Sequence, residues 1–108
     1  MASLPTTLEI GKTYFSVFYS DERLRFPVVE TLVYLGSDVV EGESGSVPGH
    51  LFQYARSFHS DGNWNRMTDE ERAEFVEPPV ILYEEAHRDP VVDVEGLIRE
   101  LREWQERK

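Results

Sequence analysis

The fold is decided by residues 28–35, Val-Val-Glu-Thr-Leu-Val-Tyr-Leu, which are polar at only two positions. A strand that is buried on both faces has a near-continuous apolar sequence, whereas a strand with one wet face alternates. Pro27 precedes this run and Gly36 follows it, and both residue types interrupt secondary structure. We therefore predict a central strand over Val28–Leu35, with the rest of a sheet arranged around it.

Three further segments have the chemistry of strands. Leu8–Tyr19 is rich in aromatic and β-branched residues, with Gly11 as a bend. His50–Phe58 alternates between an aromatic and a smaller, more polar side. Val80–Tyr83 is short and apolar. These segments predict an antiparallel sheet of about four strands, either open or curled into a small SH3-like barrel.

Two helices are expected. Thr68 and Glu71 have capping-box spacing at the start of a short acidic helix that should end by Val76, because two prolines follow. After Asp93 as N-cap, apolar residues at helical spacing form one stripe: Val94, Leu97, Ile98, Leu101 and Trp104. Gly96 interrupts this helix, and glycine costs about 1 kcal/mol relative to alanine. The fold class is therefore α+β, with the C-terminal amphipathic helix packed on the sheet.

The chain suits a single domain. Its 108 residues and 12.6 kDa leave room for one core, which we place in residues 8–108 after a flexible tail over residues 1–7. Residues 41–49 contain three glycines, two serines and one proline, a composition that predicts a mobile surface loop.

Composition also indicates the compartment. There is no cysteine, so disulfides and thiolate metal sites are excluded. Residues 1–7 have no basic or apolar region of a secretory signal, and no stretch approaches the roughly 20 apolar residues that span a bilayer. We therefore expect a cytoplasmic protein that does not insert into a membrane.

The charge is unevenly distributed. Twenty-one acids and eleven Lys or Arg residues give a net charge of −10, which argues against direct binding to nucleic acid or to an anionic membrane. Residues 69–89 hold eight of the acids and only two of the bases. This segment is either a solvated face that maintains solubility or a docking surface for a basic protein partner.

The docking hypothesis names specific side chains. Trp64 lies in a polar turn, where it either folds back onto the core or anchors an interface. The candidate partner-binding residues are Asp69, Glu70, Glu71, Glu74, Glu77, Glu84, Glu85 and Trp64.

Metal binding and catalysis have weaker support. Asp61 begins a partial calcium-loop pattern, but Arg66 and Arg72 occupy its glycine and glutamate positions. Together with Asp61, His59 and His87 are candidate zinc ligands if the fold brings them together. There is no nucleophile elbow, P-loop or dinucleotide-binding motif, so we assign no catalytic residue and no cofactor.

Three hypotheses about function follow from these features. The first is a small non-catalytic binding or inhibitor protein that docks a basic protein through the acidic segment. The second is a homodimeric accessory domain that buries an aromatic sheet face between two copies. The third is a metal-dependent enzyme that uses His59, Asp61 and His87.

Overall fold

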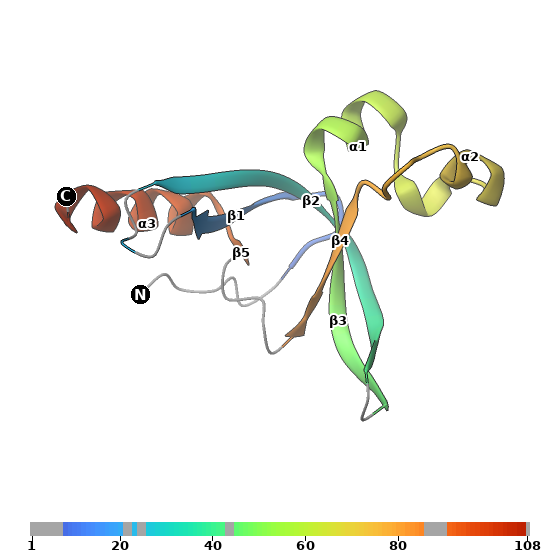
Figure 1. The fold of residues 1–108 in the computed structure, drawn as a ribbon, viewed down its shortest axis with the longest axis horizontal. Coiled ribbons are helices and arrows are strands. Elements are labelled where there is room, and N and C mark those ends of the chain that lie inside the picture. The colour runs from blue at the N-terminus through green and yellow to red at the C-terminus, as the bar shows by residue number, and fades with distance from the viewer. Residues whose placement is uncertain (1–7, 21–22, 24–25, 43–44, 86–90, 108) are drawn as a thin grey trace.

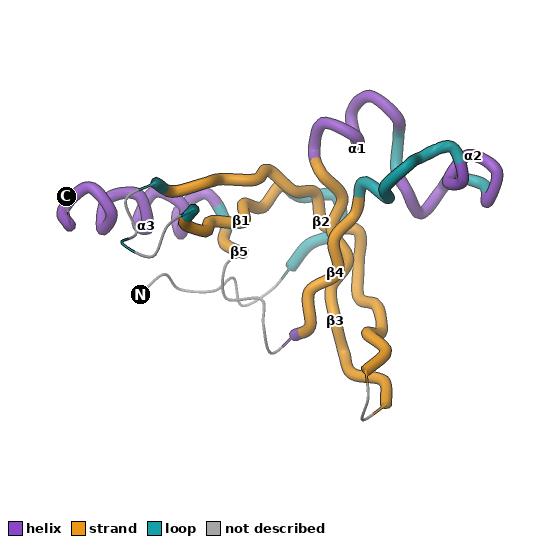
Figure 2. Tube along the Cα trace, in the orientation of Figure 1, coloured by secondary structure: helices purple, strands orange, loops and turns teal. Residues whose placement is uncertain are grey.

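The computed structural model describes residues 8–20, 23, 26–42, 45–85 and 91–107 of the chain. Within these residues the fold is α+β, with one antiparallel sheet of five strands in the order β4-β3-β2-β1-β5 (Figure 1). The strands are β1 (Thr13–Tyr19), β2 (Pro27–Gly42), β3 (Gly45–Tyr54), β4 (Val80–Glu84) and β5 (Val91–Val92). The helices are α1 (Ala55–Asp61), the 3-10 turn η1 (Trp64–Arg66), α2 (Asp69–Ala73) and α3 (Val94–Arg107), shown in Figure 2. The α+β class is confirmed, with five strands where the sequence indicated about four.

Strand β2 is the centre of the sheet and extends well beyond the apolar run that predicted it. Residues 27–33 pair with β1, and residues 32–42 pair with β3. The register of the second pairing shifts next to Gly36, whose φ of 136° is a conformation that favours glycine. Strand β2 therefore joins two wings: one with β1, β5 and α3, and one with β3 and β4 (Figure 1).

Two hydroxyl groups show how strongly the sheet curls. The Oγ of Ser16 in β1 and the hydroxyl oxygen of Tyr83 in β4 lie 3.0 Å apart. Strands β2 and β3 separate β1 from β4, so in a flat sheet these backbones would lie about 14 Å apart. The sheet therefore folds over its own concave face. It remains open between the edge strands β4 and β5, so the described chain does not form the closed barrel that was one alternative.

The core fills this concave face. Its buried members come from four strands and are Tyr14, Leu32, Tyr34, Phe52 and Val91. The ring of Phe52 has no exposed surface and meets the ring of Tyr14 edge-on, with their centroids 6.2 Å apart. Most strand aromatics are buried or half-buried in this way, whereas Phe18 is 45% exposed.

The third strand ends earlier than the sequence predicted. Strand β3 stops at Tyr54, and residues 55–61 form helix α1 instead of continuing the strand to Phe58. The turn is organised by Gln53, a fully buried amide that donates to the carbonyl of Gly62 at 2.9 Å and accepts from the Trp64 N–H at 2.9 Å. A buried polar group requires partners, and only a reversal of the chain supplies them here.

The predicted loop over residues 41–49 forms paired strands in the part that the structure describes, and its mobility stays a prediction. Residues 41 and 42 end β2, and residues 45–49 begin β3, with Glu41 opposite Ser46 in the ladder. Gly45 has a φ of 109°, so glycine serves the reversal of a hairpin rather than an unstructured loop. Residues 43–44 lie outside the described chain.

The remaining elements agree with expectation except at their boundaries. Strand β1 begins at Thr13 rather than Leu8, because the chain turns at Gly11. Helix α2 stops at Ala73, before Val76 as predicted, whereas the two-residue strand β5 was not predicted. Helix α3 begins as predicted, since the Asp93 carboxylate accepts from the Gly96 N–H at 2.8 Å.

Helix α3 packs on the sheet, as expected, through contacts with β1 and β5. The Tyr19 hydroxyl donates to Glu100 at 2.8 Å and accepts from Arg107 at 2.8 Å. None of the described helices is long and apolar enough to cross a membrane. The predicted tail over residues 1–7 lies outside the described chain.

Candidate functional site

The short helix α2 begins with the capping box that the sequence predicted. The Glu71 N–H donates to the Thr68 hydroxyl at 3.1 Å, and the Thr68 N–H donates to the Glu71 carboxylate at 3.0 Å. The exposed side chains of Asp69 and Glu70 occupy the first turn, where negative charge suits the helix dipole.

The arginine of α2 is turned away from these acids. Arg72 donates from Nε and Nη2 to the Trp64 carbonyl at 3.1 and 2.9 Å, and its guanidinium carbon lies 4.9 Å from the Trp64 ring centroid. Phe75 meets the same ring edge-on at 5.7 Å. Trp64 is therefore half-buried against Arg72 and Phe75, and its role as an interface anchor stays a prediction.

These contacts leave the carboxylates of α2 facing solvent. Arg72 is the only Lys or Arg between residues 69 and 85. We call the exposed acids of this region the acidic surface: Asp69, Glu70, Glu71, Glu74 and Glu77.

Two predicted members lie elsewhere. Glu84 ends β4 and Glu85 follows it, at the end of the strand remote from α2 (Figure 1). The carboxylate of Glu85 contacts Nε2 of the His50 imidazole. The fold thus divides the candidate partner-binding residues between two places.

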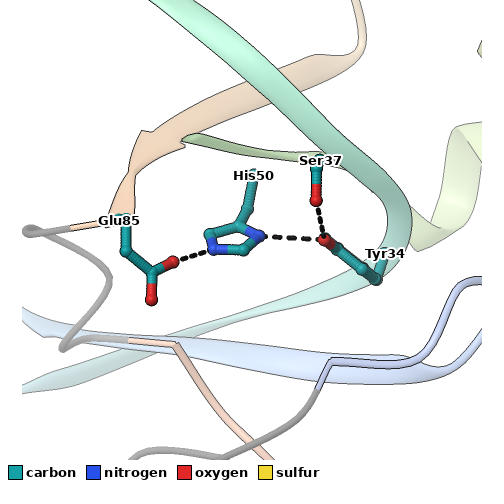
Figure 3. Close-up of polar contacts among 4 residues, drawn as sticks. All are labelled: Tyr34, Ser37, His50 and Glu85. Atoms are coloured by element: carbon teal, nitrogen blue, oxygen red, sulfur yellow. Dashed lines mark hydrogen bonds and ion pairs between the residues drawn. The ribbon is translucent and has the colours of Figure 1, made fainter. Parts of the chain in front are cut away.

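Around Glu85, a chain of polar contacts joins strands β2 and β3 to the residue that follows β4 (Figure 3). His50 in β3 contacts the Glu85 carboxylate through Nε2 and the Tyr34 hydroxyl through Nδ1, the latter at 2.9 Å. The Tyr34 hydroxyl also lies 3.5 Å from Ser37 Oγ. Tyr34 is buried while Glu85 and Ser37 are exposed, so the chain crosses the edge of the core.

The chemistry of these groups assigns their protons. An ionised carboxylate only accepts, so His50 Nε2 carries the hydrogen that faces Glu85. In the neutral imidazole, Nδ1 then accepts from the Tyr34 hydroxyl, whose oxygen accepts from Ser37. This order fixes the orientation of the His50 ring and ties β4 to β3.

Sequence reasoning placed His50 at the start of a strand and missed this chain. His50 and Glu85 are 35 residues apart, and they meet because His50 pairs with Tyr83 in the β3–β4 ladder. Ser37 contacts the tyrosine rather than the imidazole, so the geometry does not activate it as a nucleophile.

The candidate metal ligands are not gathered by the described chain. His59 and Asp61 are exposed on α1, where Asp61 accepts from the Ser57 hydroxyl at 3.1 Å. His87 lies outside the described residues. Among the residues that are described, no three His, Asp or Glu side chains are placed to hold a metal ion.

The concave face also contains a small pocket of about 170 Å³. It has aromatic, aliphatic and oxygen-bearing walls, formed by Ser16, Phe18, Glu30, Leu32, Tyr54, Ile81 and Tyr83. Burial raises the pKa of the Tyr54 hydroxyl, and electrostatic repulsion from the carboxylates of Glu30 and Glu77, and from Tyr83 when it is ionised, raises it further. Glu30 places one carboxylate beside the aromatic rings that line this pocket, an arrangement that suits a cation.

A larger groove of about 720 Å³ adjoins this pocket and shares Glu30 and Tyr54 with it. One wall is residues 29–31 of β2, and the other is residues 54–57 with His59 and Pro79.

Comparison with protein-family models, curated proteins and solved structures finds no significant match to this chain. Its function is therefore argued from these sites alone.

Proposed function

We propose that this chain is a non-catalytic binding protein that docks a basic protein partner through the acidic segment, centred on the acidic surface of α2. The observation that carries the proposal is the inward orientation of Arg72, which engages the Trp64 carbonyl and ring. The nearest base within the segment is therefore committed to the protein's own fold. The neighbouring carboxylates are left to act on a partner.

The physical mechanism is electrostatic steering. A face of one charge attracts a partner of the opposite charge before contact and raises the association rate. Screening acts over about 8–10 Å at physiological ionic strength, so the association rate should fall as salt is added. The ring contact between Trp64 in η1 and Phe75, which follows α2, holds the acidic surface in place.

The test compares two charge reversals that change the net charge equally. The double variant Glu70→Lys/Glu74→Lys alters the acidic surface, whereas Glu9→Lys/Glu106→Lys alters exposed acids elsewhere. Partners captured from lysate of the source organism at low and high salt are purified, and their association rates with each variant are measured. We expect the first variant to bind more slowly by about tenfold and to lose most of its salt dependence, while the second resembles wild type. Equal rates for the two variants would refute docking through α2.

A homodimer is the second candidate, favoured by the exposure of two phenylalanines. Phe18 and Phe26 are 45% and 56% exposed near the same end of the β1–β2 pair. Such side chains are typical of an interface when they form one patch. Light scattering tests this directly, because a monomer mass at high micromolar concentration would remove the homodimer.

A further inference from the structure

The first half of β2 has an edge without a strand beside it. Residues 27–33 pair with β1 on one side, but β3 ends at Tyr54, opposite Leu32. Figure 1 shows β2 continuing past the point where β3 turns into α1. In the described part of the chain, residues 27–31 therefore have no strand partner on this side.

Backbone hydrogen bonds of the neighbouring residues show which backbone groups face this open edge. The backbone N–H and C=O of Tyr34 point to the β1 side. The N–H donates to the carbonyl of Lys12, and the carbonyl accepts from the N–H of Gly11. The Phe26 carbonyl accepts from Ser20 on the same side. Hydrogen-bonding direction alternates along a strand, so the N–H and C=O groups of residues 29 and 31 point the other way.

The open edge borders the groove of about 720 Å³ described above. Val29 and Thr31 line one wall, and the start of α1 lines the other. An extended segment laid in this groove could form main-chain hydrogen bonds with β2 and extend the sheet by one strand.

A second copy of this chain is a poor occupant. Two copies of this edge could pair antiparallel with the register centred on residue 30 or on residue 29. The two Glu30 side chains would then lie on the same face of the sheet, directly opposite each other in the first register and diagonal in the second. Like charges in those positions are destabilising. Pro27 also lacks the N–H that the ladder would use. Charged residues and proline on an edge strand typically prevent it from pairing with another copy.

The same glutamate favours a basic occupant. A residue opposite Glu30 in an added strand points to the concave face, because facing residues share a side of the sheet. There it meets the pocket of about 170 Å³ that Glu30 shares with Phe18, Tyr54 and Tyr83. A carboxylate beside aromatic rings recognises an ammonium or guanidinium group.

We infer that residues 27–31 of β2 bind an extended segment of a basic protein as an added strand, with a lysine or arginine of that segment in the pocket beside Glu30. This inference rests on the proposed function for the identity of the partner as a basic protein. It adds the binding mode and a second contact region.

The probe is a set of blocked heptapeptides that alternate threonine and valine around one central residue. That residue is lysine, arginine, norleucine or glutamate. Amide resonances of the isotope-labelled protein are followed by NMR during titration. We expect the lysine and arginine peptides to shift the Val29 and Thr31 amides and to slow their hydrogen exchange, whereas the glutamate peptide has no effect.

Two matched controls separate the backbone from the side-chain contribution. N-methylation of the lysine peptide on the residues that face β2 should weaken binding by about tenfold or more, and methylation of the alternate residues should not. Glu30→Gln should weaken binding of the lysine peptide by about fivefold and leave binding of the norleucine peptide unchanged. The exposed Glu95→Gln in α3 should affect neither peptide.

Each contrary outcome has a distinct meaning. If no peptide shifts these amides, or if both methylation patterns are equivalent, the added strand is refuted. If the lysine peptide shifts only the amide resonances of α2, the added strand is refuted while the proposed docking through the acidic surface stands. Shifts of Val29 and Thr31 that grow with protein concentration alone would assign the edge to a second copy and overturn the inference.

Discussion

Gly96 in the first turn of α3 lies against Val92 so closely that a Cβ at Gly96 would stand 2.8 Å from the Val92 Cβ. Real Cβ atoms do not approach a stiff β-branched side chain to that distance. Glycine has a low helix propensity, but its lack of a Cβ at position 96 permits α3 to begin directly after β5. The close approach brings α3 onto the wing formed by β1 and β5.

This contact predicts that alanine at position 96 destabilises the protein, whereas helix propensity alone predicts that it stabilises the protein. Gly96→Ala should gain about 1 kcal/mol in an isolated helix. In the protein we expect it to lower the free energy of unfolding by about 1–3 kcal/mol, because overpacking displaces the start of α3. Urea unfolding measures the difference, with the exposed neighbour Glu95→Ala as a control that should stay within about 0.5 kcal/mol of wild type. Increased stability of Gly96→Ala would contradict the contact.

Gln53 makes a second prediction, about the helical part that follows β3. Gln53→Met keeps the length of the side chain but leaves the Trp64 N–H and the Gly62 carbonyl without their partner. Each lost hydrogen bond costs about 0.5–1.5 kcal/mol, because Gly62 is exposed and Trp64 is half-buried. We expect hydrogen-exchange protection of the Trp64 amide to be lost while the β1–β2 ladder stays protected.

The control for Gln53 is Ser57→Ala. Ser57 accepts from the same amide at 3.2 Å but is only one of three partners, so its removal should cost about 0.5–1.5 kcal/mol and preserve the Trp64 amide. Unchanged protection of that amide in Gln53→Met would mean that Gln53 does not hold the turn.

Elements coded by local chemistry were predictable from the sequence. The capping box of Thr68 and Glu71 depends on residues three apart, and the Asp93 cap on the first turn that it begins. The apolar run of residues 28–35 correctly located the central strand. In each instance, the residues that define the element also carry its main interactions.

Elements that depend on distant partners were not predictable in the same way. Residues 55–58 alternate as a strand would, but the amide of Gln53 obtains its partners only if the chain turns into α1. The glycines near Gly45 suggested a loop, whereas pairing across the hairpin makes strands. For the same reason the contact of His50 with Glu85 depends on the β3–β4 register, which no local spacing encodes.

The tyrosine of the concave pocket predicts behaviour at high pH. The pKa of Tyr54 is raised by burial and by Glu30, so the folded state holds the hydroxyl proton more tightly than the unfolded state. The resulting stability is fully present below the unfolded pKa of about 10 and is lost as pH rises through the higher folded pKa. Tyr54→Phe should remove this part of the alkaline loss, as measured by urea unfolding across that range.

A neighbouring variant checks the cause. Glu30→Gln removes one charge that disfavours the phenolate, so the Tyr54 hydroxyl should titrate at lower pH than in wild type. Phenolate absorbance measures this titration, with Tyr54→Phe to assign the signal. Identical titration curves with and without the Glu30 carboxylate would show that Glu30 does not contribute to the raised pKa.

The polar chain of Figure 3 predicts energetic coupling between two residues joined through His50. Tyr34 and Glu85 contact different nitrogens of the ring, and Glu85 sets the tautomer in which Nδ1 accepts from Tyr34. We expect Tyr34→Phe and Glu85→Ala each to cost about 0.5–1.5 kcal/mol. The double variant should cost less than the sum by about 0.5 kcal/mol or more, since either change already disrupts the chain.

The decisive control for this coupling removes the intermediary. In a His50→Leu background, Tyr34→Phe and Glu85→Ala should become additive, because no ring remains to transmit the effect of one on the other. Urea unfolding of both cycles gives the comparison at constant pH. Coupling that persists without the imidazole would locate it in the packing of β3 against β4, whereas coupling that disappears with the ring assigns to His50 the link between the edge strand and the core.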